Sequence, residues 1–231
     1  PLGYYGRRID EVAAVYDDID TALIAAIAVR DPRGSFWNFA VRAALVVLIA
    51  MAAGITTTVI LRRRQPPDGG VAWRRLAHLG ADLAGVLVYM AALVGIYLVI
   101  RPQNPAAGVL LHALLVAGVT FGLIAALAGL VFAPGRPADG LAGLDGAAAR
   151  RAYRIVLVTT GLFVTGGMLG RFVAGTGAAW DFAVAIALPV ASLAYLYLVV
   201  ELVIHRRALG GAIAGALGDS PRARLVGLIA P

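Results

Sequence analysis

Five long apolar runs without charged side chains follow one another along the chain. A helix rises about 1.5 Å per residue, so the first run would reach roughly 28 Å, close to the hydrocarbon thickness of a bilayer. The runs do not alternate apolar and polar residues, as strands of a membrane barrel would, and therefore predict helices. They are Ala43–Leu61, Leu83–Ile100, Ala106–Phe132, Ile155–Gly170 and Phe182–Val200. The sequence thus predicts an all-α, polytopic integral membrane helical bundle whose five transmembrane helices occupy residues 36–207.

Arginine is concentrated in alternate connections between these runs. The four connections and the segment after the fifth run carry five, one, four, one and four arginines. Short loops rich in arginine stay on the cytoplasmic side of a membrane. We therefore predict that the first and third connections and the C-terminal segment, residues 208–231, are cytoplasmic, and that the N-terminus is outside.

The segment before the first run, residues 1–35, has the pattern of an amphipathic helix. Its apolar residues recur at alternating spacings of three and four, which places one apolar stripe on a helix. They are Ile9, Val12, Tyr16, Ile19, Leu23 and Ala26. Two interpretations remain open: a surface helix packed on the membrane domain, or a helix that contacts a neighbouring subunit.

Composition supports the membrane assignment. Apolar residues make up 61% of the chain and charged residues only 14%, below the 25% or so of soluble proteins. All basic charge is arginine near helix ends, which favours lipid headgroups over nucleic acid as its partner. The chain has no cysteine, which excludes disulfides and thiol chemistry. It starts at Pro1 and stops on an apolar stretch, so we expect a longer protein from which a leader was removed.

The sequence carries no recognisable motif for catalysis, nucleotide binding or metal binding. The histidines have no metal-ligand spacing, and His112, inside the third run, is expected to be hydrogen-bonded within the bundle. No carboxylate lies deep in a run, since Asp82 and Glu201 stand at run boundaries. This argues against a carrier driven by protons or sodium. No nucleotide-binding or hydrolase motif occurs. We therefore expect no enzyme activity, cofactor, metal or small-molecule substrate.

Small residues suggest where the helices pack. Gly118 and Gly122 in the third run, and Gly166 and Gly170 in the fourth, each share one helix face. Such faces allow close approach of helices in lipid, either within one chain or between chains. Pro189 interrupts the hydrogen bonds in the middle of the fifth run and is expected to bend it.

The cytoplasmic arginines are candidate contacts for anionic lipid headgroups. They can form one basic belt at the membrane surface, or they can mark topology without any lipid specificity. The candidates are Arg62, Arg63, Arg64, Arg74, Arg75, Arg150, Arg151, Arg154, Arg206 and Arg207.

Three stretches resemble the N-terminal membrane region of large bacterial mechanosensitive channels of the MscS family, of the moderate-conductance YbiO type. The first, "FWNFAVRAALVVLIAMAAGITTTVILRRR", resembles that family's first span. The second runs from "LLHALLVAGVTFGLIAALAGL" through the paired Arg150 and Arg151 to "IVLVTTGLF", and resembles the third span, its loop and the start of the fourth. The third, "ALPVASLAYLYLVVELVIHRRALGGAI", is similar to the fifth span and its basic exit.

The resemblance implies a lipid-facing, tension-sensing paddle outside the pore of a homo-heptameric channel. It also implies the bacterial inner membrane, with a periplasmic N-terminus and a cytoplasmic C-terminus, and membrane lipids and the chain's own subunits as partners. Two alternatives remain: a subunit of a membrane transporter or permease, and a structural membrane anchor.

Overall fold

The computed structural model of the chain describes residues 25, 36–64, 70–100, 105–136, 139–177 and 180–206. Within these ranges the chain is helical and contains no strand. The amphipathic helix expected in residues 1–35, the segment 208–231 and Arg207 lie outside the described residues.

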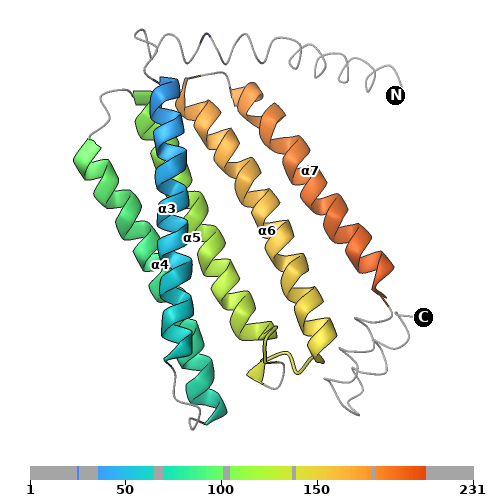
Figure 1. Ribbon diagram of the computed structural model, residues 1–231. Helices are drawn as coiled ribbons and strands as arrows, with labels where there is room; N and C mark the ends of the chain where they lie inside the picture. The colour runs from blue at the N-terminus through green and yellow to red at the C-terminus, as the bar shows by residue number, and fades with distance from the viewer. Residues whose placement is uncertain are drawn as a thin grey trace, which may run out of the picture. The chain divides into compact units, whose positions relative to one another are not determined.

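Five helices make up most of the described residues (Figure 1). Each is long and apolar enough to cross a membrane, which confirms the prediction of an all-helical chain with five candidate spans. The helices are α3 (Phe36–Arg63), α4 (Val71–Ile100), α5 (Pro105–Phe132), α6 (Gly146–Gly175) and α7 (Trp180–Ile204).

The helices extend past the apolar runs into the arginine-rich sequence. Arg74 and Arg75, expected in a connection, lie in the first two turns of α4. Arg62 and Arg63 likewise form the last turn of α3. Arginine is a good helix former whose long side chain can reach polar surroundings from an apolar helix end, so the loss of hydropathy does not stop the helix.

The start of α6 is fixed by a side-chain cap. Asp145 Oδ1 accepts hydrogen bonds from the backbone N–H groups of Ala147, at 2.9 Å, and Ala148, at 2.7 Å. These donors have no partner inside the helix, so an aspartate at this position stabilises its first turn. The helix therefore begins at Gly146, before the apolar run Ile155–Gly170, and includes Arg154.

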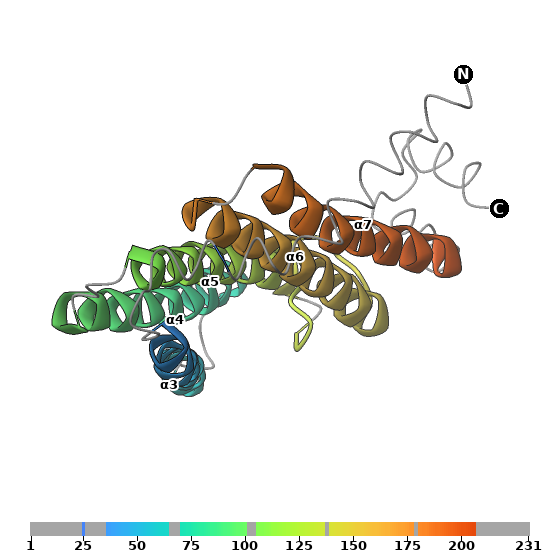
Figure 2. The same ribbon diagram turned by 90° about the horizontal axis from the view of Figure 1, so that it is seen from above.

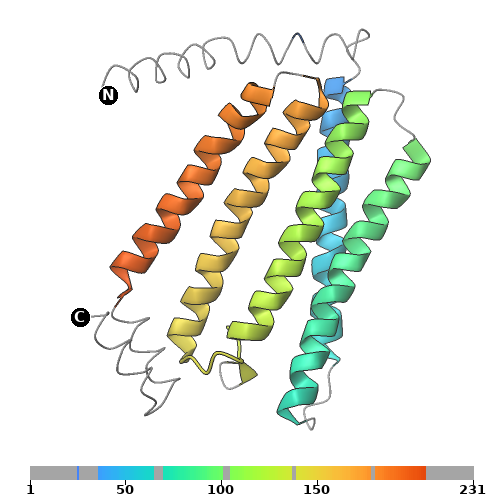
Figure 3. The ribbon, with the colours of Figure 1, turned by 180° about the vertical axis from the view of Figure 1, so that it is seen from behind.

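The chain divides into two compact units, and each unit contains about one half of every helix. The first comprises Pro1–Ala53, Val88–Val119 and Phe163–Ser192, and the second comprises Gly54–Leu87, Thr120–Leu162 and Leu193–Pro231. Within each unit, helix halves that are consecutive in the chain lie side by side and run in opposite directions (Figures 1 and 3).

In the first unit, α3 packs on α4 and α5 through a small apolar core. Ala50 of α3, Tyr89 and Leu93 of α4, and Leu111 of α5 form this buried cluster. Figure 2 shows α3 beside α4 when the helices are viewed from above. The core is small, and between 11% and 22% of the residues in the most apolar stretch of each helix are buried.

Small and large apolar residues are distributed differently from those of a water-soluble helical bundle. Most of the buried apolar residues are alanines, for example Ala149 and Ala194, which are fully buried. Large apolar side chains point outward instead: Leu48 of α3 is 61% exposed and Leu196 of α7 is 57% exposed. Small residues between helices and large ones outside are typical of helices that pack in lipid.

Candidate functional site

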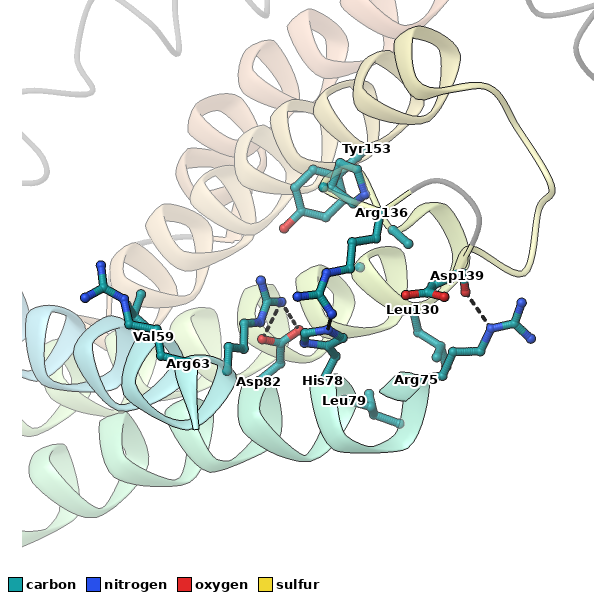
Figure 4. A pocket seen from close by; sticks show the side chains of 15 residues that line it. Val59, Arg63, Arg75, His78, Leu79, Asp82, Leu130, Arg136, Asp139 and Tyr153 are labelled. Atoms are coloured by element: carbon teal, nitrogen blue, oxygen red, sulfur yellow. Dashed lines mark hydrogen bonds and ion pairs between the residues drawn. The ribbon is translucent and has the colours of Figure 1, made fainter. Parts of the chain in front are cut away.

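A polar cavity of about 580 Å³ lies in the second unit, at the end of the helices where the arginines gather. Its walls come from the last turns of α3, the first turns of α4, the end of α5 with its following loop, and α6 (Figure 4). Val59, Leu79 and Leu130 supply an apolar part of the wall. Its polar side chains are Arg62, Arg63, Arg75, His78, Asp82, Arg136, Asp139 and Tyr153.

The cavity is organised around two side chains of α4, His78 and Asp82. They are one helical turn apart, so they stand on the same face of the helix. Arg62, from the end of α3, approaches both carboxylate oxygens of Asp82 at 2.7 Å. The Arg62 side chain is 44% exposed and that of Asp82 only 14%, so the arginine covers the carboxylate from the open side.

Arg136 is held over the neighbouring turn of α4 by His78. The α5 helix ends at Phe132, and Ala133, with a positive φ of 41°, turns the chain into the loop that carries Arg136. The Nη1 atom of Arg136 lies 3.3 Å from Nε2 of His78 (Figure 4). An arginine has no acceptor, so His78 Nε2 accepts and Nδ1 carries the proton. That Nδ1 is buried and has no partner in the described part of the chain.

A second contact fastens the same loop to the start of α4. Arg74 Nη2 lies 2.9 Å from Oδ1 of Asp139, whose side chain is almost completely buried. Arg75 donates from Nε to the backbone oxygen of Asp139 and from Nη2 to that of Gly140, the latter at 3.2 Å. The two arginines thereby fix the loop that carries Arg136 against α4.

Positive charge is in excess around the cavity. Asp82 is paired with Arg62, and Asp139 is paired with Arg74, which does not line the cavity. The guanidinium groups of Arg63, Arg75 and Arg136 therefore have no carboxylate partner among the described residues. Such an arrangement suits an anion. No group of three or more His, Cys, Asp or Glu side chains in the described ranges could hold a metal ion.

The other predicted headgroup contacts lie elsewhere. Arg154 of α6 faces Glu201 of α7 at 4.0 Å, and His205 contacts the same carboxylate at 3.3 Å. Among the predicted arginines, Arg62, Arg63 and Arg75 line the cavity, and Arg74 lies beside it. The other predicted arginines do not line the cavity. The exposed or half-exposed arginines outside the wall are Arg64, Arg150, Arg151, Arg154 and Arg206.

The predicted packing glycines lie at helix contacts within the chain. In the first unit, a side chain at Gly118 would overlap the ring of Tyr89, and one at Gly170 would lie 3.2 Å from Ala187 Cβ. Gly166 approaches α7 equally closely, since a Cβ added there would lie 3.2 Å from the backbone oxygen of Ala187.

In the second unit, Gly122 packs against Val86 of α4, where an added Cβ would lie 2.6 Å from Cγ2. Pro189 lies inside α7, which continues through it, and the predicted bend stays a prediction. His112 is exposed on α5, and no partner for it occurs among the described residues, contrary to the expected hydrogen bond within the bundle. His112 lines a small cavity together with Leu93 and Tyr97 of α4.

Sequence reasoning missed the residues that organise the cavity. His78 and Asp82 precede the apolar run Leu83–Ile100, and their spacing of four signals a shared face only once the helix is known to begin at Val71. Asp139 is an acid in a basic connection, which signals an ion pair. The chain matches no family model, no curated protein and no solved structure.

Proposed function

We propose that this chain is the lipid-facing, tension-sensing transmembrane region of a bacterial mechanosensitive channel. The observation that carries the proposal is the distribution of residue size. Alanine and glycine lie between the helices, while large apolar side chains such as Leu45 and Ile49 are exposed. A surface of this kind is stable only when lipid or another membrane helix covers it.

Tension can act on such helices through their area in the membrane. The apolar core is small, and at most 22% of the residues in the most apolar stretch of any helix are buried, so little tertiary packing opposes a change in the spacing or tilt of the helices. Tension favours the state of larger area, and the shift is as large as the area difference between the two states allows. Contacts between small residues permit both a close and a separated arrangement of neighbouring helices, which gives the two states.

The ion path is assigned to another part of the protein. Outward-facing side chains in the middle of the spans are largely apolar, for example Leu48, Leu127 and Leu188. The two acids inside the helices away from their first turns, Asp82 and Glu201, both face arginine. A conducting pore needs polar or charged side chains, or backbone carbonyls, along a water-filled path.

Patch-clamp recording tests this proposal. The full-length protein should conduct when suction is applied to the membrane, whereas residues 1–231 alone should form no channels. Bulky substitutions at Gly118 or Gly122 should shift the opening threshold and leave the unitary conductance unchanged. A changed conductance would place α5 in the pore and refute the proposed role.

A transporter or permease subunit is the second candidate. The observation in its favour is the cavity beside the charged pair Arg62 and Asp82, since ionisable groups inside membrane helices often mark transport pathways. Uptake of a substrate by the full-length protein without applied tension, and its loss in Asp82→Asn, would support this candidate instead.

A further inference from the structure

The geometry points to a binding site for a phosphate-bearing anion in the cavity between Arg62, Arg136 and Tyr153. The inference rests on the proposed function only in placing the chain in a membrane. It assigns the site a ligand chemistry, a phosphate monoester or diester, that can come from a lipid headgroup or from a soluble compound.

Two guanidinium groups converge on adjacent turns of α4. Arg62 is bound to Asp82, and Arg136 is bound to His78. His78 and Asp82 are one helical turn apart, so the Cβ atoms of these two residues are about 6 Å from each other. Planar guanidinium groups donate paired hydrogen bonds that match the oxygens of a phosphate. Arg62 uses one guanidinium nitrogen to bind Asp82, and Arg136 uses one to bind the neutral ring of His78. Both guanidinium groups therefore retain N–H donors for a ligand.

Tyr153 completes the site from the opposite wall. It comes from α6, and Figure 4 shows its hydroxyl directed toward the side of the cavity where Arg136 and Asp82 lie. A tyrosine hydroxyl can donate to a phosphate oxygen without adding charge. The site thus offers donors from three elements, α3, the loop after α5, and α6.

The shape of the cavity suits an amphiphile. Its volume of about 580 Å³ falls within the range of small-molecule sites and leaves room beyond a single phosphate. Val59, Leu79 and Leu130 line it together with the polar groups, which accommodates an apolar stem next to a charged head.

The depth of the site agrees with a headgroup. The 30 residues of α4 reach about 45 Å, well beyond a hydrocarbon core of about 30 Å, and Asp82 lies about three turns from its start. The charged first turns of α4, from Arg74 to Asp82, therefore belong at headgroup level. Basic pockets between helices on the cytoplasmic side are known to bind anionic lipid headgroups.

The test compares lipid and soluble phosphate on the purified chain. One arm measures, by native mass spectrometry, phosphatidylglycerol retained from mixed micelles with phosphatidylcholine. The other measures binding of inorganic phosphate and glycerol 3-phosphate by calorimetry at constant ionic strength. The variants are Arg136→Gln, whose side chain has His78 as its partner, and Tyr153→Phe, which removes only a hydroxyl. Arg171→Gln is the matched control, because Arg171 is exposed near the other end of α6, does not line the cavity and is not one of the predicted headgroup contacts.

Arg136→Gln should weaken binding about fivefold, the scale of one arginine at a membrane surface. Tyr153→Phe should weaken it less, and Arg171→Gln should stay within about twofold of the unchanged chain. Arg136→Lys keeps the charge without the paired donors and should fall between Arg136→Gln and the unchanged chain. Thermal unfolding of each variant in detergent separates lost binding from lost structure.

Selective, Arg136-dependent retention of phosphatidylglycerol would identify a lipid headgroup. Arg136-dependent binding of the soluble phosphates without selective lipid retention would identify a soluble ligand and support the same chemistry. The inference is wrong if no probe depends on Arg136, or if Arg171→Gln loses as much binding as Arg136→Gln. These readouts need no applied tension, so a failure to conduct would refute the proposed function and leave this site standing.

Discussion

The ring of Tyr89 lies against Gly118, and its hydroxyl donates a hydrogen bond to the backbone oxygen of Leu114 at 3.0 Å. Tyr89 is only 8% exposed, so its polar end has to be satisfied inside the apolar contact between α4 and α5. Any side chain at Gly118 would occupy the space of the ring. The glycine and the tyrosine therefore form one packing unit in which each determines what the other position can hold.

Gly118→Ala should destabilise the chain although alanine is the better helix former. Its Cβ would overlap the Tyr89 ring, and overpacking of this kind costs about 1–3 kcal/mol. The control is Gly108→Ala on the same helix, where nothing lies within 4 Å of the new Cβ and helix propensity favours alanine by about 1 kcal/mol. Thermal unfolding in detergent should rank Gly118→Ala below the original chain and Gly108→Ala at or above it. Equal behaviour of the two variants would contradict the contact.

Tyr89→Phe should have a small effect, because it keeps the ring and removes one hydrogen bond. Hydrogen bonds between membrane helices contribute about 0.6 kcal/mol to stability on average. The backbone of Leu114 remains part of the α5 helix in this variant. Tyr89→Leu makes a sharper test, since it opens space beside Gly118. In that background Gly118→Ala should cost clearly less than it does alone. Strictly additive losses in the double variant would show that the two residues do not share the contact.

The five helices could be predicted from the sequence because each depends on one local property, a long apolar run. The packing faces of Gly118 and Gly170 could be predicted as well, since two small residues four apart must share a helix face. The partners of these faces could not be predicted. Tyr89 and Ala187 are found opposite them only once the register between neighbouring helices is known.

The cavity was beyond prediction for a related physical reason. It depends on how far α3 and α4 continue past their apolar runs, which brings Arg62 opposite Asp82 and Arg74 opposite Asp139. Hydropathy changes at the membrane surface, whereas a helix ends where its hydrogen bonds or side chains stop it. The arginines were therefore identified as a group by their charge, and their individual partners were not.

Exchanging the charges of Arg62 and Asp82 in a double variant should restore the stability that either single charge reversal loses. The pair is half exposed on the arginine side, and ion pairs of this kind contribute about 0–1 kcal/mol. Arg62→Asp alone places two carboxylates together, and Asp82→Arg alone places two arginines together, so each should lower the unfolding temperature. The double variant should recover most of that loss, and the gap should narrow at 0.5 M salt, where exposed charges are screened. No recovery in the double variant would indicate that the pair adds nothing measurable.

Labelling of single cysteines with a membrane-impermeant maleimide tests the predicted orientation, and the chain needs no cysteine removed beforehand. The arginine distribution predicts labelling from outside at Asp20 and Asn104, and protection at Asp68. The structure guides the remaining choices in the third and fourth connections. Gly140 and Thr176 are buried and would react poorly on either side, whereas Leu141, at 56% exposed, and Asp181 are accessible.

Leu141→Cys should therefore be protected in intact cells and react after the membrane is opened, because it lies in the third connection between the apolar runs, which carries four arginines. Asp181→Cys should react in intact cells, because the single Arg171 leaves its connection poor in positive charge. Reaction at both positions after permeabilisation is the control for access. Labelling of Leu141→Cys from outside would show that the chain has the opposite orientation in the membrane, with Arg62 and Arg136 on the periplasmic side. Inverted membrane vesicles should then show the opposite pattern at both residues, which distinguishes a reversed chain from a mixture of orientations.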